Sequence, residues 1–536
     1  MCDIHIRRTL LSVSDKTGIV ELAKVLTKFD CEIISTGGTR KVLEEAGIKV
    51  TEIQTVTGNP EAFGGRMKTI SFNIESAILF DRDKDAAEAA KLGIQPIDLV
   101  VCNLYPFSEV KDSGVDLEKL IENIDIGGPT MLRAAAKNFK YVAVVTNVED
   151  YQLIINELKE NDGALSYDSR FKLMRKAFNH TADYDALIST TMDEQAEEKS
   201  IRLHFTGGKK LRYGENSHQQ GYFFREAGKQ ESLYDMQILH GKEISYNNLN
   251  DIQGAIDSVK DLNRFAVAVI KHSNPCGLAE ADDQYTAMQL AWQGDPVSAF
   301  GSIIAFNQPV ELKTVEFFEL NNEDKSQRKF VEVVVAPSYS EEALTYLEFH
   351  KNLRIVKFNP DKSRSKIDMK YLFNSLLVQD TDTILYEKME VITKRKVDVK
   401  KQKKLIEFGI IAMRQVKSNS IVIVREIDRA FQLLGMGAGQ PNRLISTKLA
   451  IEKAAENLTF EYKGEDINDY YNQEFGKSIL VSDAFFPFPD NVVTAAQAGI
   501  KTIVQPGGSM RDKQVIKACD ELDVVMIFTG IRHFKH

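Results

Sequence analysis

Cysteine, tryptophan and long apolar runs are all scarce in this 536-residue chain. Its five cysteines lie far apart (Cys2, Cys31, Cys102, Cys276 and Cys519), so we expect no disulfide framework and a reducing, cytoplasmic compartment. No apolar run approaches the ~18 residues of a membrane-spanning helix. The first residues also lack the apolar core of a signal peptide, so neither secretion nor a membrane partner is expected.

Positive charge is in deficit as well. The formal net charge is −9, which argues against general affinity for nucleic acid or acidic membranes. An anionic small ligand stays compatible with this charge, because lysines and helix N-termini bind phosphate locally. The basic run Lys394–Lys404 is interpreted as a solvated face, since a charge run alone is weak evidence for a binding patch.

Strand and helix patterns alternate along the chain. Within residues 1–195, strands are expected at 9–14, 32–35, 98–105 and 141–146. This alternation predicts a parallel sheet covered on both faces, with ligands beyond the carboxyl ends of its strands. The polar segment Thr190–Arg202 marks the main domain boundary, and a softer one falls at Asn359–Asp368. Apolar runs at 265–270, 302–307, 330–336, 420–424, 478–482 and 501–505 predict a second, larger α/β region.

Three loops of the first region combine small polar residues with glycine. Ser12–Gly18 and Ser35–Thr39 each lie between a strand and a helix pattern, where glycine and free N–H groups favour a phosphate. Ordinary helix capping is the alternative, and the two stay open. In the third loop, Asp125 precedes a predicted helix that Lys137 closes. These two charges either complement the helix dipole or serve one ligand as acid and base.

The segment "VIKHSNPCG", Val269–Gly277, places a lysine, a histidine and a cysteine within six residues. It could be a Cys/His nucleophile pair, half of a metal site, or a proton-transfer device whose cysteine only packs. Zinc deaminases need H-x-E and P-C-x-x-C; here Asn274 and Ala279 stand where the glutamate and second cysteine would be. We therefore expect no metal, and a turn at Asn274, Pro275 and Gly277 with Cys276 packed beside it.

Many ordered words then carry a family resemblance: "SVSDKTG", "STGGT", "GGRMKT", "NLYPF", "IDIGG", "KHSNPCG", "DPVSAFGS", "GMGAGQ", "SDAFFPF" and "QPGGS". The chain resembles the bifunctional purine-biosynthesis enzymes with phosphoribosylaminoimidazolecarboxamide formyltransferase and IMP cyclohydrolase activities. The resemblance implies an α/β fold: a methylglyoxal-synthase-like, doubly wound parallel-sheet domain (1–195) and two cytidine-deaminase-like α/β subdomains (200–365 and 366–536). It also implies a homodimer with transferase sites at the interface.

For the transferase, the resemblance implies formyl transfer from 10-formyltetrahydrofolate, a co-substrate, to the 5-amino group of 5-amino-1-(5-phosphoribosyl)imidazole-4-carboxamide. His272 would take the amine proton, Lys271 would stabilise the oxyanion or protonate the folate nitrogen, and Asn419 would position the reacting groups. No covalent enzyme intermediate is needed, which removes the role of a thiol nucleophile. The implied substrate contacts are Arg212, Tyr213, Gly301, Glu332, Phe486 and Arg532.

For the cyclohydrolase, the resemblance implies attack of the carboxamide nitrogen on the formyl carbon, with loss of water, to give IMP. Asp125 and Lys137 would orient and activate the carboxamide, while Lys68 and Tyr105 would stabilise the oxyanion. The nucleotide and its phosphate would be held by Ser12, Ser14, Lys16, Ser35, Thr36, Gly37, Gly38, Arg66 and Thr69.

The chain departs from the family pattern beside the predicted cyclohydrolase site. The family usually has K-T-L-H-P and then H-G-G, whereas Ser71 and Phe72 stand here for the histidine and proline, and Glu75–Ala77 for the H-G-G. Pro489 and Phe373–Ser375 are two further departures. Two alternatives to the bifunctional enzyme follow: a formyltransferase whose N-terminal domain only binds nucleotide, and a non-catalytic nucleotide-binding regulatory protein.

Overall fold

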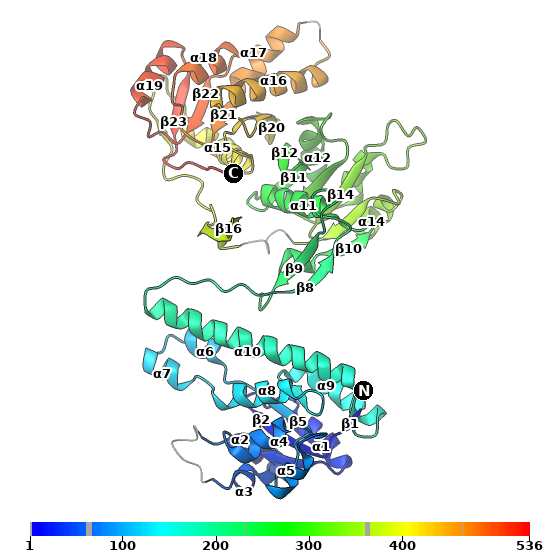
Figure 1. Cartoon of the computed structure of the whole chain (residues 1–536). Helices are drawn as coiled ribbons and strands as arrows, with labels where there is room; N and C mark the ends of the chain where they lie inside the picture. Colours follow the sequence, from blue (N-terminus) through cyan, green and yellow to red (C-terminus); the bar gives the residue numbers. More distant parts are fainter. Residues whose placement is uncertain (1–2, 60–66, 230, 360–364, 465) are drawn as a thin grey trace. The chain divides into compact units, whose positions relative to one another are not determined.

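The structure, a computed structural model, describes residues 3–59, 67–229, 231–359, 365–464 and 466–536 (Figure 1). The chain divides into two compact units, Met1–His204 and Phe205–His536. Each unit has its own apolar core. Within the described residues, no helix is long and apolar enough to cross a membrane.

Unit 1 is built on a five-stranded sheet of order β4-β3-β2-β5-β6, in which every neighbouring pair is parallel. The strands are β2 (Arg8–Val13), β3 (Glu32–Ser35), β4 (Thr51–Glu52), β5 (Leu99–Asn103) and β6 (Ala143–Val145). All four strands expected from the sequence are therefore confirmed. β2 and β5 are almost wholly buried, as strands covered on both faces must be.

Helices flank this sheet on both sides, because the chain leaves its centre in two directions. α1 (Ile19–Lys28) connects β2 to β3, and α8 (Gly127–Lys137) lies between β5 and β6 on the other side of the strand order. Right-handed crossovers then place the two helices on opposite faces. α4 (Phe72–Leu79) and the long α10 (Tyr167–Gln195) pack against α8, and α9 (Tyr151–Glu160) packs against α1 (Figure 1).

Unit 2 is built on one twelve-stranded sheet of order β10-β15-β14-β13-β11-β12-β20-β19-β21-β22-β23-β18. Its first half contains β10 (Gln237–His240), β11 (Phe265–Lys271), β12 (Asn274–Ala281), β13 (Ser302–Phe306), β14 (Val331–Ala336) and β15 (Arg354–Lys357). Its second half contains β19 (Ile421–Ile427), β20 (Ala430–Gly437), β21 (Ile479–Ser482), β22 (Thr502–Gln505) and β23 (Val525–Phe528). All six apolar runs expected to be strands in this region are confirmed.

The two halves of this sheet repeat one topology. Each begins with an antiparallel hairpin (β11–β12 and β19–β20), continues with an antiparallel third strand, and ends with two parallel strands. The halves meet where β12 pairs with β20 in antiparallel fashion. This repeat of an α/β unit accords with the expected pair of deaminase-like subdomains, although the sequence itself shows no obvious repeat.

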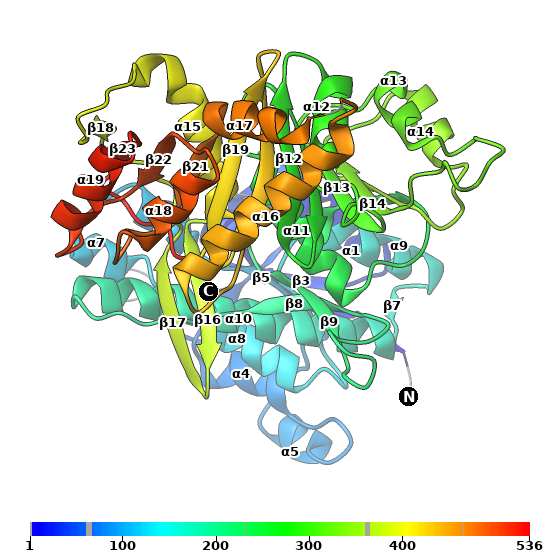
Figure 2. The same ribbon diagram turned by 90° about the horizontal axis from the view of Figure 1, so that it is seen from above.

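Helices cover both faces of the sheet, as Figures 1 and 2 show. α11 (Tyr246–Val259) and α15 (Val399–Arg414) share one core with alternate residues of β11. The other face carries α12 (Gln284–Gln293), α14 (Glu341–Leu347), α16 (Arg443–Glu461), α18 (Asp490–Gln497) and α19 (Asp512–Glu521). Burial on both faces explains the continuous apolar run of β11.

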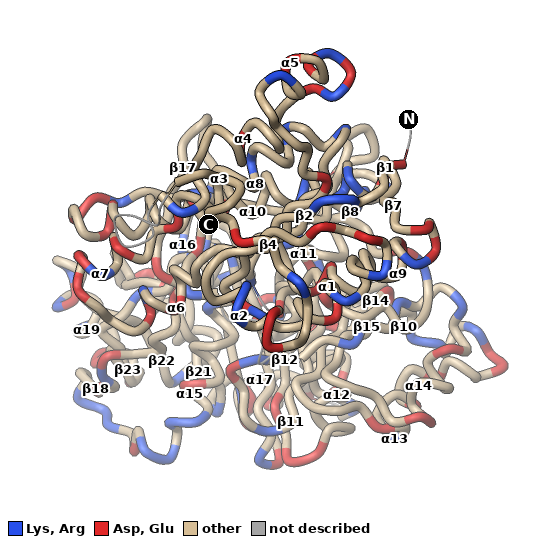
Figure 3. The backbone as a smooth tube through the Cα atoms, turned by 90° about the horizontal axis from the view of Figure 1, so that it is seen from below, with Lys and Arg blue, Asp and Glu red and all other residues tan. Residues whose placement is uncertain are grey.

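Charge is mixed over the surface, with one basic stretch. The run Lys394–Lys404 follows β18 (Glu390–Val391) and enters α15; it appears as blue tube after the β18 label in Figure 3. All its lysines and its arginine are exposed, and Arg395 pairs with Asp523. This placement agrees with the interpretation as a solvated face.

Candidate active sites

The first candidate site lies at the carboxyl edge of the sheet in unit 1, where two lysines meet the start of α2 (Gly37–Glu45). A β-carbon built on Gly37 would stand 2.5 Å from Nζ of Lys68, and one on Gly38 would stand 3.7 Å from Nζ of Lys16. Gly37 also has φ +36, a conformation that suits glycine. Two ammonium groups and the free N–H groups of a helix start therefore converge, as a phosphate requires.

The hydroxyl groups near this candidate phosphate site differ in whether they are free to contact a ligand. Ser12 Oγ lies 3.2 Å from Thr36 Oγ1, so these two side chains share the mouth of the site. Ser35 is fully buried and donates to Leu11 O, so its hydroxyl is committed to the sheet. Ser14 contributes its backbone N–H to Asn103 Oδ1 and its carbonyl to Lys16 Nζ. Asn103, which the sequence did not single out, thus fixes the first loop.

A second helix start supplies the acid. Asp125 Oδ1 accepts from Gly128 N at 2.8 Å, and Asp125 N donates to Tyr184 Oη on α10. Burial raises the pKa of Asp125, and backbone N–H groups of Gly128 and Tyr105 offset part of that rise. Thr69 lies against the same turn, since a β-carbon on Gly127 would stand 2.4 Å from its hydroxyl oxygen.

Tyr105 follows β5 and is half-exposed beside this acid. Burial, and then the charge of Asp125, raise the pKa of its phenol. A phenol that holds its proton can donate a hydrogen bond to a developing oxyanion. Lys68, Tyr105 and Asp125 therefore gather at the carboxyl edge of one sheet.

Lys137 does not join them within this unit. It is the last residue of α8, exposed, while Asp125 precedes the first. A helix of this length separates its ends by roughly 15 Å, which exceeds the reach of the two side chains. The two charges therefore do not contact each other, and both interpretations of Lys137 stay predictions. Arg66 lies outside the described residues.

The second candidate site lies at one edge of the large sheet, which we call the site edge: the edge where β11 ends and β19 begins. There β11 and β12 are joined by a two-residue turn, His272–Ser273, with φ +51 and +60. The expected turn at Asn274, Pro275 and Gly277 is therefore wrong, because these residues open β12. Pro275 and Cys276 fall instead at a bulge in the hairpin register.

Hydrogen bonds from two side chains hold this turn, and its histidine is exposed. Asp251 on α11 accepts from Ser273 N at 2.7 Å, and Asn274 Nδ2 donates to His272 O. Left-handed φ values at a non-glycine pair cost free energy and persist only where surrounding contacts impose them. His272 is exposed. Sequence reasoning missed Asp251, for which no local signal exists.

Lys271 is held by the neighbouring loop. Its Nζ donates to Phe300 O at 2.7 Å and to Gly301 O at 3.2 Å. An ammonium has three donors, so one remains for a ligand. Gly301 itself has φ +70 and its N–H donates to Phe330 O.

Cys276 packs, as expected. Its Sγ lies 3.3 Å from Val269 O, and burial raises the pKa of the thiol to about 12. A thiol with that pKa is inert at neutral pH. Among the described residues no group of three or more His, Cys, Asp or Glu side chains could hold a metal ion.

Asn419 reaches the site edge from the second half of the sheet. Its Nδ2 donates to Gln440 O at 2.7 Å, and its carbonyl accepts from Ser446 Oγ. The flanking Ser418 Oγ and Ser420 N both donate to Asp483, which is fully buried and paired with Arg443. Asp483 therefore anchors this segment; only its place in "SDAFFPF" pointed to it.

The remaining predicted contacts share this edge with different exposure. Glu332 is the second residue of β14 and accepts from Asn248 Nδ2. Arg212 stacks on Tyr213, with 5.6 Å between guanidinium carbon and ring centre, in a loop tied to α11 through Asn247 and Glu215 O. Arg532 is exposed beyond β23, but Phe486 is fully buried in the core under α16 and α18. A substrate contact by the Phe486 ring is therefore not available in this conformation.

Within one chain, the two parts of this site stand apart. Lys271 ends β11 and His272 follows it, while Asn419 precedes β19, and β12 and β20 lie between. Three strand spacings correspond to about 14 Å. The residues thus share an edge without closing around one small molecule.

Comparison with known proteins identifies the family of this chain. A family model described as "AICARFT/IMPCHase bienzyme" matches residues 135–453, and one described as "MGS-like domain" matches residues 18–130. The protein "Bifunctional purine biosynthesis protein PurH" of Persephonella marina is 43% identical over 541 residues, covering 99% of this chain and 100% of that protein. This chain belongs to the AICARFT/IMPCHase bienzyme family.

Two more proteins of the AICARFT/IMPCHase family are similar to this chain over nearly its whole length. The proteins of the same description from Ruminiclostridium cellulolyticum and Bacillus mycoides are 42% and 44% identical, each covering 99% of this chain and 100% of its own length. A solved structure described as "Crystal structure of ForH" is 34% identical, with a TM-score of 0.31, and covers 34% of this chain and 98% of that one.

The departure from the AICARFT/IMPCHase pattern after Lys68 forms a regular helix start. Ser71 is the N-cap of α4, its Oγ accepting from Ile74 N at 3.2 Å, and Phe72 opens the helix with its ring exposed. Glu75 sits in the first turn, with Oε1 buried and without a hydrogen-bond partner. Burial raises its pKa from 4.5 to about 6.

The two other departures from the family pattern lie at a helix start and in a hairpin turn. Pro489 is the N-cap of α18. Phe373 and Asn374 form the turn between β16 (Ile367–Leu372) and β17 (Ser375–Asp380), with φ +36 and +64 and the Phe373 ring wholly exposed.

The raised pKa of Glu75 predicts a pH-dependent stability of unit 1. A carboxyl whose folded pKa exceeds its unfolded value stabilises the fold below pH 4.5, and this contribution is lost as pH rises through 6. Because Glu75 is half-buried, we discount the full shift to about 1 kcal/mol. Glu75→Gln should therefore raise the free energy of unfolding by about that amount at pH 7.5 and leave it unchanged at pH 4.5. Denaturant titration at both pH values measures the change. Glu88→Gln, at an exposed position on α5 (Ala86–Lys91), is the control; equal shifts in both variants would contradict the account.

Proposed function

We propose that this chain catalyses the last two steps of de novo purine biosynthesis. It transfers the formyl group of 10-formyltetrahydrofolate to the 5-amino group of 5-amino-1-(5-phosphoribosyl)imidazole-4-carboxamide, and then cyclises the product to IMP. Family membership over the full chain supports both activities. The observation that carries the transferase assignment is the His272–Ser273 turn, which exposes an imidazole beside a lysine held by two carbonyls.

In the transfer step, the amino nitrogen attacks the formyl carbon on N10 of the folate. His272 accepts the proton that this nitrogen loses, which is general-base catalysis by an imidazole. Lys271 directs its remaining N–H toward the carbonyl oxygen as negative charge develops there. The C–N10 bond then breaks as N10 takes the proton from His272, which returns this side chain to its starting form, and Asn419 orients the nucleotide.

In the cyclisation step, the carboxamide nitrogen attacks the formyl carbon and water leaves. Asp125 accepts from the carboxamide N–H with the oxygen that Gly128 does not occupy, which increases the nucleophilicity of that nitrogen. Lys68 and Tyr105 donate to the oxyanion. Lys16, Gly37, Gly38, Ser12 and Thr36 hold the nucleotide, and roles for Lys137 and Arg66 stay predictions.

The assembly proposed for this activity is a homodimer whose two copies complete each transferase site. The roughly 14 Å between the Lys271–His272 turn and Asn419 in one chain supports it. The proposed domains are residues 1–195, 200–365 and 366–536. A cytoplasmic location is proposed as well; the described cysteines (Cys31, Cys102, Cys276 and Cys519) are unpaired, as in reducing compartments.

One assay separates this function from its alternatives. The purified chain is given the carboxamide ribonucleotide with 10-formyltetrahydrofolate, and separately the formylated intermediate, while tetrahydrofolate and IMP are followed. We expect both products. Tetrahydrofolate without accelerated IMP would select the formyltransferase that only binds nucleotide in unit 1. Formation of neither product would select the non-catalytic protein, and sedimentation of the same sample as a monomer would contradict the dimer.

A further inference from the structure

Helix α16, in the second half of unit 2, contacts a loop of the first half. The loop, residues 295–301, leads from α12 into β13 and carries Phe300 and Gly301, whose carbonyls accept from Lys271 Nζ. Lys453 of α16 pairs with Asp295, with 3.2 Å between Nζ and Oδ2. Asn457, one turn further along α16, donates from Nδ2 to Gly294 O and to Leu434 O. Two side chains of one helix thus hold the start of this loop.

Asp295 also organises the loop internally. Its Oδ1 accepts from Ser298 N at 3.0 Å, and its carbonyl accepts from Ala299 N. Ser302 N in turn donates to Ala299 O at 3.2 Å, which closes the turn around Phe300 and Gly301. A continuous series of contacts therefore runs from Lys453 through Asp295 to the two carbonyls that hold Lys271.

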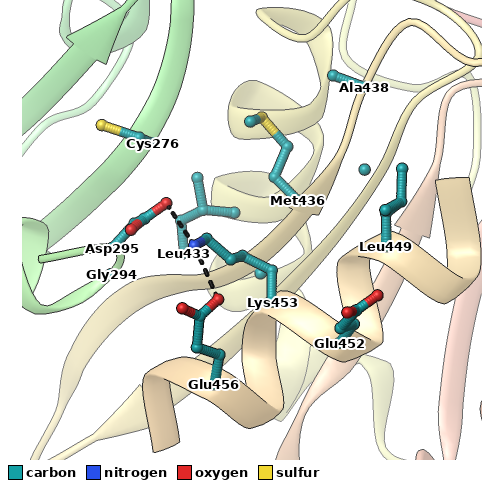
Figure 4. A pocket seen from close by; sticks show the side chains of 12 residues that line it. Cys276, Gly294, Asp295, Leu433, Met436, Ala438, Leu449, Glu452, Lys453 and Glu456 are labelled. Carbon is teal, nitrogen blue, oxygen red and sulfur yellow. Dashed lines mark hydrogen bonds and ion pairs between the residues drawn. The ribbon is translucent and has the colours of Figure 1, made fainter. Parts of the chain in front are cut away.

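The pair lies in a confined setting. Lys453 forms part of the wall of a cavity of about 310 Å³ that α16, β20 and the residues Gly294 and Asp295 line, and its ammonium lies between Asp295 and Glu456 (Figure 4). The Asp295 side chain is only 7% exposed, whereas that of Glu456 is 46% exposed. Water therefore reaches Asp295 much less than Glu456. Loss of the lysine would therefore leave a buried carboxylate without its counter-charge, and such a group rearranges or takes up a proton.

We propose that Lys453 and Asp295 are a positioning pair for formyl transfer: α16 fixes the 295–301 loop so that its carbonyls aim the Lys271 ammonium at the developing oxyanion. This inference rests on the proposed role of Lys271. Lys453 touches no substrate and acts through Lys271 alone. Displacement of a positioned group by about 1 Å costs about 100-fold in rate in the severe case; a partial shift of this loop should cost about tenfold.

The effect should fall on kcat. Lys271 meets charge that exists only in the transition state, so misplacing it lowers kcat and leaves KM for both substrates nearly unchanged. A general loosening of unit 2 would instead raise KM and lower the thermal midpoint. Lys453→Arg retains the charge toward Asp295 and should restore most of kcat.

The test uses the full-length chain and initial rates of tetrahydrofolate formation. We expect kcat to fall about tenfold in Lys453→Met, with KM within twofold, and Lys453→Arg to stay within threefold of wild type. Lys448→Met, at an exposed lysine of the same helix, is the matched control and should match wild type. In a Lys271→Ala background, Lys453→Met should cost less than a further twofold, because the residue it serves is gone.

Two results would overturn the proposal: an unchanged kcat in Lys453→Met, or multiplying losses in the double variant. If Lys453→Met does not fold, Asp295→Asn, which keeps an acceptor for Ser298 N, must show the same loss of kcat and the same non-additivity with Lys271→Ala. Absence of tetrahydrofolate formation by the wild-type chain is a different outcome, which contradicts the proposed function itself.

Discussion

Replacement of His272 by asparagine should reduce formyl transfer by two to four orders of magnitude, the usual contribution of a general base. Asparagine suits this test better than alanine, because it tolerates the left-handed backbone that the turn imposes. The turn and its bond to Asp251 should survive, while no group remains that accepts the amine proton. The measurement is kcat for tetrahydrofolate formation, together with thermal unfolding.

A matched control exists at the other hairpin of the repeat. Asp428 and Arg429 form the corresponding two-residue turn between β19 and β20, with φ +46 and +69, at the opposite edge of the sheet. Arg429→Asn should leave transfer unchanged. The account of the base is contradicted if His272→Asn keeps transfer within threefold of wild type.

Replacement of Asp125 by asparagine should reduce cyclisation at least 100-fold and leave formyl transfer intact. The amide oxygen still accepts from Gly128 N, so the start of α8 is preserved. What is lost is the charge that activates the carboxamide. Conversion of the formylated intermediate to IMP measures the effect, and Asp112→Asn, at an exposed position of unit 1, is the control.

The pKa of Asp125 adds a pH signature to this prediction. Burial raises that pKa above the ordinary value of aspartate, about 3.9. Because the carboxylate is the active form, the rate of cyclisation should fall when the pH is lowered through this raised pKa, which is earlier than for an ordinary aspartate. Formyl transfer does not use Asp125, so its pH dependence should be the same in wild type and in Asp125→Asn. A wild-type rate in Asp125→Asn would remove this residue from the mechanism.

The buried strands could be predicted from the sequence, because a strand that is buried on both faces has a continuous run of apolar residues. β11, β13, β19, β21 and β22 all carry such runs. β12 was missed, since its opening Asn274, Pro275 and Gly277 have the composition of a turn. The actual turn, His272–Ser273, carries no turn signal and depends on Asp251, which lies 22 residues before Ser273 in the chain.

The candidate sites show the same limit. The family resemblance was needed to propose Lys68, whereas local motifs drew attention to Asp125, which precedes α8, and to Lys271, which ends β11. Exposure and distance were not predictable: Phe486 is buried by packing of α16 and α18, and Lys137 stands at the far end of α8. Ser71 and Glu75 illustrate a third case, in which a departure from the family pattern becomes an ordinary helix N-cap and a buried acid.

The most direct test of the account follows the formyl carbon itself. The purified chain is incubated with the carboxamide ribonucleotide and 10-formyltetrahydrofolate carrying ¹³C in the formyl group, and the label is located by NMR. The account predicts that the label leaves the folate, passes through the formylated intermediate and arrives at C2 of the purine ring of IMP. Label that stays on the folate would contradict the central claim.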